Sequence, residues 1–188
     1  DVVFTSAAEY IHNRTGDRVP VATWNASSTV SVLQRVNVNL NQVFGNLIWN
    51  APAQTNNGVL EEGLAIVGKL TIINTGTGQL RTSSTSSVTD ITIGTLEQSG
   101  GSFRINGTDS EVIITDNATL SGGTLVARAS GGASTLNIKG DLTISGGTIE
   151  QSAGLATVLF SGNSVQTFDF TSGAITGEVD FILDSGAE

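Results

Sequence analysis

The sequence predicts an all-β protein of the parallel β-solenoid type, in which the chain winds through stacked coils of short strands. The main observation is a repeat, because parts of residues 140–149 recur at 118–125 and at 68–72, and the longer offset is three times the shorter. The second is composition, with 23 glycines among 188 residues separating short runs of alternating apolar and polar side chains. Alternation indicates strands, and repetition at roughly 20–50 residues is typical of solenoids. Regularly spaced strands also fit an antiparallel sandwich, which does not require repeated residue identities.

Three kinds of strand are expected in each coil. The first reads apolar, Thr, apolar, and falls at 70–72, 91–93, 118–120 and 142–144. The second reads Gly, any residue, aliphatic, and falls at 78–80, 94–96, 123–125 and 147–149. The third has alternating apolar pairs at 64 and 66, 112 and 114, 136 and 138, and 158 and 160. Because side chains alternate between the two faces of a strand, we expect Leu70, Ile72, Leu142 and Ile144 inside and the intervening threonines outside.

The turns between these strands are expected to stack as well. Glycines recur at equivalent places, namely Gly45, Gly68, Gly78, Gly94, Gly123, Gly140 and Gly147. Asparagines recur at nearly equal steps close to the repeat length, namely Asn25, Asn50 and Asn74. Asparagine tolerates left-handed backbone and can hydrogen-bond along a stack, so these three predict a turn ladder.

About eight coils of roughly 24 residues would form one solenoid segment over residues 1–188. Residues 1–9 match residues 180–188 at a constant offset of 179, keeping Asp, Ser, Ala and Glu and an apolar residue at each of the three positions after Asp. We therefore expect one super-repeat, 1–179, followed by the start of the next, 180–188. The chain is then a fragment of a longer protein built from such units.

Charge and composition disfavour several classes of partner. The net charge is −9, with only eight Lys and Arg residues, so nucleic acids and anionic membrane surfaces are poor partners. No apolar run approaches the roughly 20 residues of a membrane-spanning helix, so direct membrane insertion is not expected. The absence of cysteine rules out disulfides and thiolate chemistry.

Motifs along most of the chain resemble one family of proteins. They are Ala8-Glu9-Tyr10, His12-Asn13, Pro20, Ala22-Thr23-Trp24-Asn25, Phe44-Gly45-Asn46-Leu47, Gly76-Thr77-Gly78 and Val165-Gln166-Thr167-Phe168. Together they resemble the long repetitive β-helix surface proteins that Bacteroidetes-type bacteria export through type IX secretion. The resemblance implies a right-handed parallel β-helix, a cell-surface or extracellular location, a very large parent protein, and a role in adhesion or surface architecture. It supplies no catalytic motif.

Parallel β-helices also carry polysaccharide lyases and glycosidases, which need clustered carboxylates and often a basic residue. Asp109 and Glu111 form a close acidic pair with Arg104 nearby, and these three are the candidate ligand-binding residues. Surface loop charge is the simpler interpretation. We expect no catalytic residue, no metal site and no cofactor, and so a protein that is not an enzyme.

Two other sets of residues call for a functional test. An outward column is expected at Lys69, Asp90, Asn117 and Asp141, interpreted as a solvated turn column with weak calcium binding as the alternative. Its charges also argue against ice binding by the neighbouring threonines. Trp24 and Trp49 could form a sugar-stacking platform, but Trp49 aligns with inward Ile72, which favours core packing. Phe168 and Phe170 are expected as an inward pair.

Three functional hypotheses remain. The favoured one is a structural or adhesive module that acts as a rigid spacer or filament in a large secreted bacterial surface protein. Its partners would be neighbouring modules of the same chain, and glycans or other cell-surface proteins. The alternative is a glycan- or host-surface-binding module. The third hypothesis is a catalytic or non-catalytic part of a polysaccharide-degrading enzyme.

Overall fold

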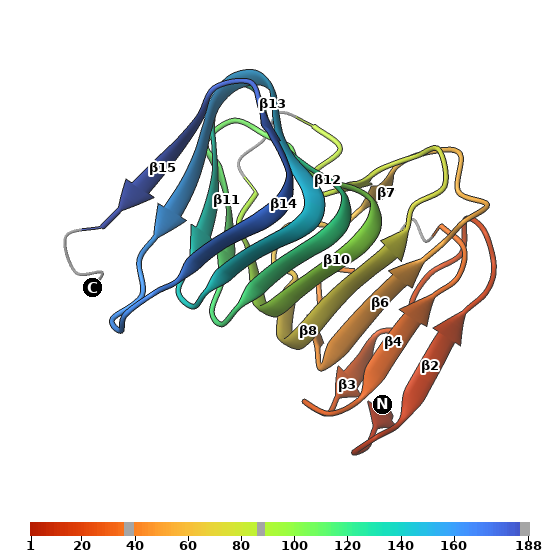
Figure 1. Ribbon diagram of the computed structural model, residues 1–188. Coiled ribbons are helices and arrows are strands. Elements are labelled where there is room, and N and C mark those ends of the chain that lie inside the picture. Colours follow the sequence, from red (N-terminus) through yellow and green to blue (C-terminus); the bar gives the residue numbers. More distant parts are fainter. Residues whose placement is uncertain (36–39, 86–88, 185–188) are drawn as a thin grey trace.

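The chain winds into a β-solenoid, as the sequence predicts. The computed structural model describes residues 1–35, 40–85 and 89–184, without the side chains of 128–131. Within these residues all helical or extended structure is strand, and the strand pairs are parallel. Figure 1 shows the coils stacked from the red first coil to the blue last coil. There are about seven turns of about 23 residues each, slightly fewer and shorter than expected.

The strands of the described residues follow one another with short turns. They are β1 (Val2–Phe4), β2 (Glu9–His12), β3 (Ala22–Trp24), β4 (Thr29–Val32), β5 (Val43–Phe44), β6 (Asn46–Asn50), β7 (Gly58–Val59), β8 (Ala65–Asn74), β9 (Leu80–Arg81), β10 (Ile91–Ile105), β11 (Ser110–Ile114), β12 (Ala118–Ile138), β13 (Leu142–Phe160), β14 (Phe168–Thr176) and β15 (Val179–Leu183). Strands β10, β12 and β13 are long because they bend around corners, so each contributes to more than one face of the solenoid (Figure 1).

The largest face, here called face A, carries two inward columns, one residue from each coil. One column runs Tyr10, Val30, Leu47, Leu70, Leu96, Ala118, Leu142 and Phe168. The other runs His12, Val32, Trp49, Ile72, Gln98, Leu120, Ile144 and Phe170. Between the first and last coils their members are fully buried or nearly so. Each aliphatic side chain buried in this way stabilises the fold by about 1.5–3 kcal/mol.

Two further faces carry the other strands of the solenoid. Face B carries the inward column Leu80, Phe103, Leu125, Ile149 and Ile175. Face C carries the column Phe4, Trp24, Phe44, Ile66, Ile93, Ile114, Ile138, Phe160 and Leu183. Leu70, Ile72, Leu142 and Ile144 therefore point inward, as predicted.

The predicted alignment fails in one coil. Residues 91–93 lie on face C, where Ile93 pairs with Ile66 and Ile114. Their expected place on face A is taken by residues 96–98, since Leu96 pairs with Leu70 and Ala118. The residue that follows Leu70 in its column is thus Leu96, where the sequence suggested Ile91. Both segments have the same apolar alternation, so the pattern alone could not separate them.

The second strand kind shifts for the same reason. Residues 94–96 were expected on face B, but Phe103 occupies that column, paired with Leu80 and Leu125. The glycine that precedes this strand is therefore Gly101 in place of Gly94. The other expected members, at 78–80, 123–125 and 147–149, keep their place on face B.

Glycine turns stack at two corners, and close approach explains why glycine is needed. At the start of face A, Gly68 N donates to Gly45 O at 2.8 Å, and a Cβ on Gly94 would lie 2.2 Å from Gly68 O. Gly140 continues this corner by donating to Asp116 O at 3.0 Å. The corner between faces A and B includes Gly78, Gly123 and Gly147, and Gly123 has a left-handed φ of 74°.

The predicted three-asparagine ladder is wrong. Asn50 does pair with Asn74, but Asn25 follows β3 on face C and belongs to another turn. Asn25 Oδ1 accepts a hydrogen bond from Ser27 N at 3.0 Å, and Asn74 Oδ1 accepts one from Gly76 N at 2.8 Å. Asn25 and Asn74 thus each close a turn of their own, a local use of the side chain that recurs although these two residues share no column.

Candidate functional site

The three candidate ligand-binding residues have separate partners in neighbouring coils. Asp109 adopts a left-handed φ of 54°, and its Oδ1 accepts a hydrogen bond from Ala133 N at 3.0 Å. Glu111 Oε1 accepts a hydrogen bond from Asn137 Nδ2 at 2.8 Å. Both carboxylates therefore tie one coil to the next, a structural role that accounts for their presence near β11.

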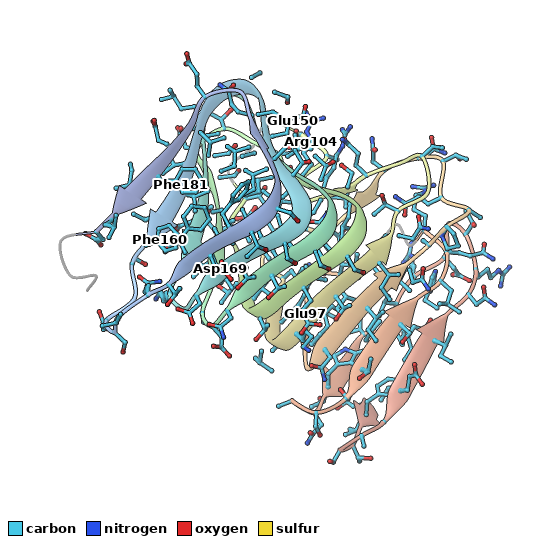
Figure 2. The ribbon with its side chains drawn as sticks, viewed as in Figure 1. Glu97, Arg104, Glu150, Phe160, Asp169 and Phe181 are labelled. Carbon is cyan, nitrogen blue, oxygen red and sulfur yellow. The ribbon has the colours of Figure 1, made fainter. Side chains whose placement is uncertain are left out.

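Arg104 lies on the outward side of face B. Its side chain is only 8% exposed, and its Nη1 lies 3.3 Å from Gln79 Oε1 in the preceding coil. Gln79 Oε1 also accepts hydrogen bonds from Arg81 at 2.8 and 3.0 Å. Figure 2 shows Arg104 and Glu150 on the same side of the molecule, and both belong to one outward column. The hydrogen bond from Arg104 to Gln79 therefore runs along the stack, and it is separate from those of Asp109 to Ala133 and of Glu111 to Asn137.

The predicted outward column has a different membership and a clear structural role. Asp90 does not belong to it, because Thr95 pairs with Lys69. Asn117 Oδ1 accepts from Asp141 N at 2.8 Å, and Asp141 Oδ1 accepts from Thr167 N at 2.7 Å. These side chains form a ladder to the backbone of the next coil. Their carboxylate and amide oxygens are therefore used in the fold.

The outward threonines do not make a uniform array. On face A, Thr71 and Thr119 are separated by Glu97, and the column ends at Asp169 after Thr143. Figure 2 shows Glu97 and Asp169 at opposite ends of this part of the face. Lys69 Nζ and Glu97 Oε1 form an ion pair. The face is a mixed polar surface of hydroxyls and charges.

Neither tryptophan offers a sugar-stacking surface. Trp49 is fully buried, and its Nε1 donates to Gln54 Oε1 at 3.0 Å. Trp24 is 8% exposed and stacks on Phe4, with ring centroids 4.0 Å apart. The prediction of core packing is confirmed for both. The two rings nevertheless lie on different faces, so the sequence match between them was coincidental.

Metal binding and pockets are two further ways in which the described residues could form a site. Across residues 1–35, 40–85 and 89–184, no group of three or more His, Cys, Asp or Glu side chains could hold a metal ion. A pocket of about 230 Å³ includes Glu61, Glu62 and Thr82 in its lining. Glu61 Oε2 already accepts a hydrogen bond from Leu40 N at 2.7 Å, which assigns one of the two carboxylates to the fold.

The end of the stack exposes a large apolar surface, here called the tail surface. It is formed by the last coil, and its exposed apolar side chains are Phe168, Phe170, Ile175, Ile182 and Leu183, between 37% and 71% exposed. Phe168 stacks on Phe181 with centroids 5.1 Å apart. Phe168 and Phe170 point inward as predicted, since they extend the columns of Leu142 and Ile144. They are exposed because no described coil lies above them.

Comparison with known proteins adds no assignment. No family model, curated protein or solved structure matches the chain. Within the part of the chain that the structure describes, no helix is long and apolar enough to span a membrane.

Proposed function

We propose that this chain is a structural module of a large secreted or cell-surface bacterial protein, in which it acts as a rigid spacer or filament unit. The proposal rests on one observation: residues that are equivalent in the 179-residue sequence repeat occupy equivalent positions in the stack of coils. The offset of 179 equates Phe4 with Leu183, and both residues lie in the same inward column of face C. A second unit can therefore continue the same column without a change of register. Residues 185–188, the other half of the match, lie outside the described residues.

The contacts of the predicted site residues support this role. Asp109, Glu111, Asn117 and Asp141 all bind groups in the next coil. Side chains used in this way stiffen the stack, because each coil is fixed to its neighbours by strand pairing, apolar packing and side-chain ladders. At about 4.8 Å per coil, seven turns make a body roughly 35 Å long.

Location and export belong to the same proposal. A net charge of −9 favours solubility, and a chain without cysteine folds independently of redox conditions. The resemblance to repetitive surface proteins supports a location outside the cell, with export by the type IX route. Neighbouring modules of the same chain are then its principal partners.

Glycan or host-surface binding is the second candidate. It is supported by the polar outer side of face A, where Thr71, Thr119 and Thr143 are placed along the stack with Glu97 and Asp169. Hydroxyls and carboxylates at regular spacing could contact sugar hydroxyls. The two tryptophans add nothing to such a surface, because both are buried.

Electron microscopy of a protein with three units at the 179-residue spacing tests the spacer role. We expect straight rods that lengthen by roughly 35–40 Å per unit, at about 4.8 Å per coil. Flexible strings of globular beads would contradict the proposal. A glycan array probed with the 188-residue chain tests the second candidate, and a specific hit that is lost on changing Thr119 and Thr143 to Lys would favour it.

A further inference from the structure

The last coil resembles the first in position as well as in sequence. Strand β15 lies on face C, where Phe160 pairs with Leu183, and β1 lies on the same face, where Phe4 pairs with Trp24. The match at offset 179 makes β15 the counterpart of β1. A strand that pairs with β1 is therefore suited to pair with the free edge of β15.

We propose that the tail surface is a docking site for a second copy of this unit, in which β15 replaces the second copy's β1. The second copy's β2 then pairs with the free edge of β14, and its β3 pairs with the free edge of β15. The inference rests on the proposed function as a stacked unit, and it adds which strands form the seam and in which register.

The inward columns determine the register on face A. Tyr10 begins the column that ends at Phe168, and His12 begins the column that ends at Phe170. Across the seam Phe168 lies next to the second copy's Tyr10, and Phe170 next to its His12. These contacts cover phenyl rings that are 43% and 45% exposed at present. Burial of both rings in aromatic contacts gives the seam a register-specific apolar centre.

The same logic gives the register on face C. In the first coil Val2 pairs with Ala22, and Phe4 pairs with Trp24. With β15 in the place of β1, Phe181 pairs with the second copy's Ala22 and Leu183 with its Trp24. Leu183 is 71% exposed at present, so it gains the most burial of the tail residues.

The order in which strands of face C and face A alternate along the chain explains why β15 must replace β1. A copy that kept its own β1 above β15 would add a strand on face C without a matching strand on face A. No strand of the second copy would then pair with the free edge of β14. The replacement removes this mismatch, because β15 then supplies what β1 supplies in the first coil.

The distribution of charge determines which ends of two copies can meet. Residues 141–184 contain six acidic residues and no Lys or Arg, whereas residues 1–35 contain three of each sign. Two tail surfaces would repel each other, but a tail and a first coil have no net repulsion. The contact is head-to-tail, and a head-to-tail contact that does not close extends as a filament.

Two fusions that differ only in whether the second copy's residues 1–9 are present test the seam. In the in-phase fusion residue 188 is followed directly by residue 10 of a second copy, and in the out-of-phase fusion it is followed by residue 1. We expect amide hydrogen exchange on β14 and β15 to slow at least tenfold in the in-phase fusion, relative to the 188-residue chain. The out-of-phase fusion should show less than a threefold change. Equal exchange in both fusions, or no slowing in either, would overturn the proposal.

Substitutions in the in-phase fusion separate the seam from general stability. Phe170→Asp should restore fast exchange on β14, while Phe170→Leu should keep most of the protection. Val165→Asp is the matched control, because Val165 is 76% exposed but lies outside the inward columns. Loss of protection with Val165→Asp as well would assign the effect to acidity alone and contradict the seam.

The outcome is separable from that of the spacer role. Straight rods in the microscope without slowed exchange on β14 and β15 would leave the spacer role standing and remove this seam. Slowed exchange in flexible particles would support the seam and remove the spacer role.

Discussion

A few polar side chains sit inside the apolar columns, and each has a specific neighbour. Gln98 is 1% exposed, and its Nε2 donates to Thr124 O at 3.1 Å in the next coil. His12 is also buried, and its Nδ1 lies 3.3 Å from the Tyr10 hydroxyl. Among the described residues, Gln98 Oε1 and His12 Nε2 have no hydrogen-bond partner. An unpaired buried group costs about 1–3 kcal/mol, so these two positions reduce the stability of the fold.

Tyr10 provides a direct spectroscopic test of the first coil, because it is the only tyrosine in the chain. Burial, and secondarily the negative charge of Asp17, raise the pKa of Tyr10 above its usual value near 10. The neutral phenol is thus favoured in the folded state. The corresponding stability is fully present below the pKa of the unfolded chain and is lost as pH rises through the folded pKa.

Absorbance at 295 nm measures this ionisation. We expect the titration midpoint of the folded chain to lie above that of the chain in concentrated urea. Asp17→Asn should lower the folded midpoint without moving the unfolded one. A folded midpoint at or below the unfolded value would contradict the placement of Tyr10 against the core.

Gly94 tests the close approach of coils. A Cβ at this position would lie 2.2 Å from Gly68 O and 2.7 Å from Val67 O, both backbone atoms that cannot move independently. We expect Gly94→Ala to destabilise the protein by about 1–3 kcal/mol in urea unfolding, the usual cost of overpacking. Gly63→Asn is the control, since Gly63 has open space around it and a φ of 83° that asparagine tolerates. An equal or larger loss with Gly63→Asn would argue against the steric explanation.

At the scale of the element, pairing partners decide the fold more than residue pattern does. Strand β10 contains three apolar alternations, 91–93, 96–98 and 103–105, and each joins a different face. A strand of this kind bends from face C to face A while it stays paired with the strands of the neighbouring coils. Long bent strands therefore give the coil its corners.

A double-mutant cycle tests the observed register. Ile93 and Ile114 pair directly on face C, so Ile93→Ala and Ile114→Ala should show a coupling free energy of about 0.5–3 kcal/mol. Ile93 and Leu142 lie on different faces, and their substitutions should be additive within about 0.5 kcal/mol. Urea unfolding of the single and double variants gives both numbers. Additivity of Ile93 with Ile114 would mean that the register on face C is wrong.

Much of this architecture could be predicted from the sequence where coil length is constant. The segments at 118–120 and 142–144 were paired correctly, because Ala118 and Leu142 lie one regular repeat apart in the sequence and pair directly in the structure. The error at 91–93 arose because one coil is longer, and apolar alternation carries no information on coil length. The alignment of Asn25 with Asn50 and Asn74 failed for a related reason. Asparagine closes local turns on any face, so its recurrence in the sequence does not show that two turns stack.

The candidate site was harder to predict. Asp109 and Glu111 attract attention as a pair of carboxylates, but their binding partners, Ala133 and Asn137, lie a full coil further along the chain. Only the stacking of coils brings those groups together. The tail surface was also missed, because Phe168 and Phe170 look like ordinary inward residues until the end of the stack is known.

At the scale of the whole molecule, stability depends on neighbours in the stack. Strand β13 pairs with β12 on one side and with β14 and β15 on the other, whereas β14 and β15 each pair with β13 alone. Each coil is held by its nearest neighbours, so the last coil has about half the contacts of an internal one.

Hydrogen exchange of the 188-residue chain should reveal this gradient. We expect the amides of β14 and β15 to exchange at least tenfold faster than those of β12 and β13, because local opening is easiest at an uncovered end. Mass spectrometry of peptides from these strands provides the measurement, with peptides from β6 and β8 as the internal reference. Uniform protection along the stack would indicate that opening is global.

The direction of the inter-coil hydrogen bonds has a mechanical consequence. Parallel pairing between successive coils, as between β12 and β13, places these bonds along the axis of the stack. Tension applied between the two ends of the chain therefore breaks them one coil at a time, beginning at an end of the stack, where a coil has a neighbour on one side only. Each released coil of about 23 residues yields roughly 80 Å of extended chain, at about 3.3–3.6 Å per residue. A force–extension trace should show a series of small, nearly equal steps, so the module lengthens gradually under load and dissipates energy at each step.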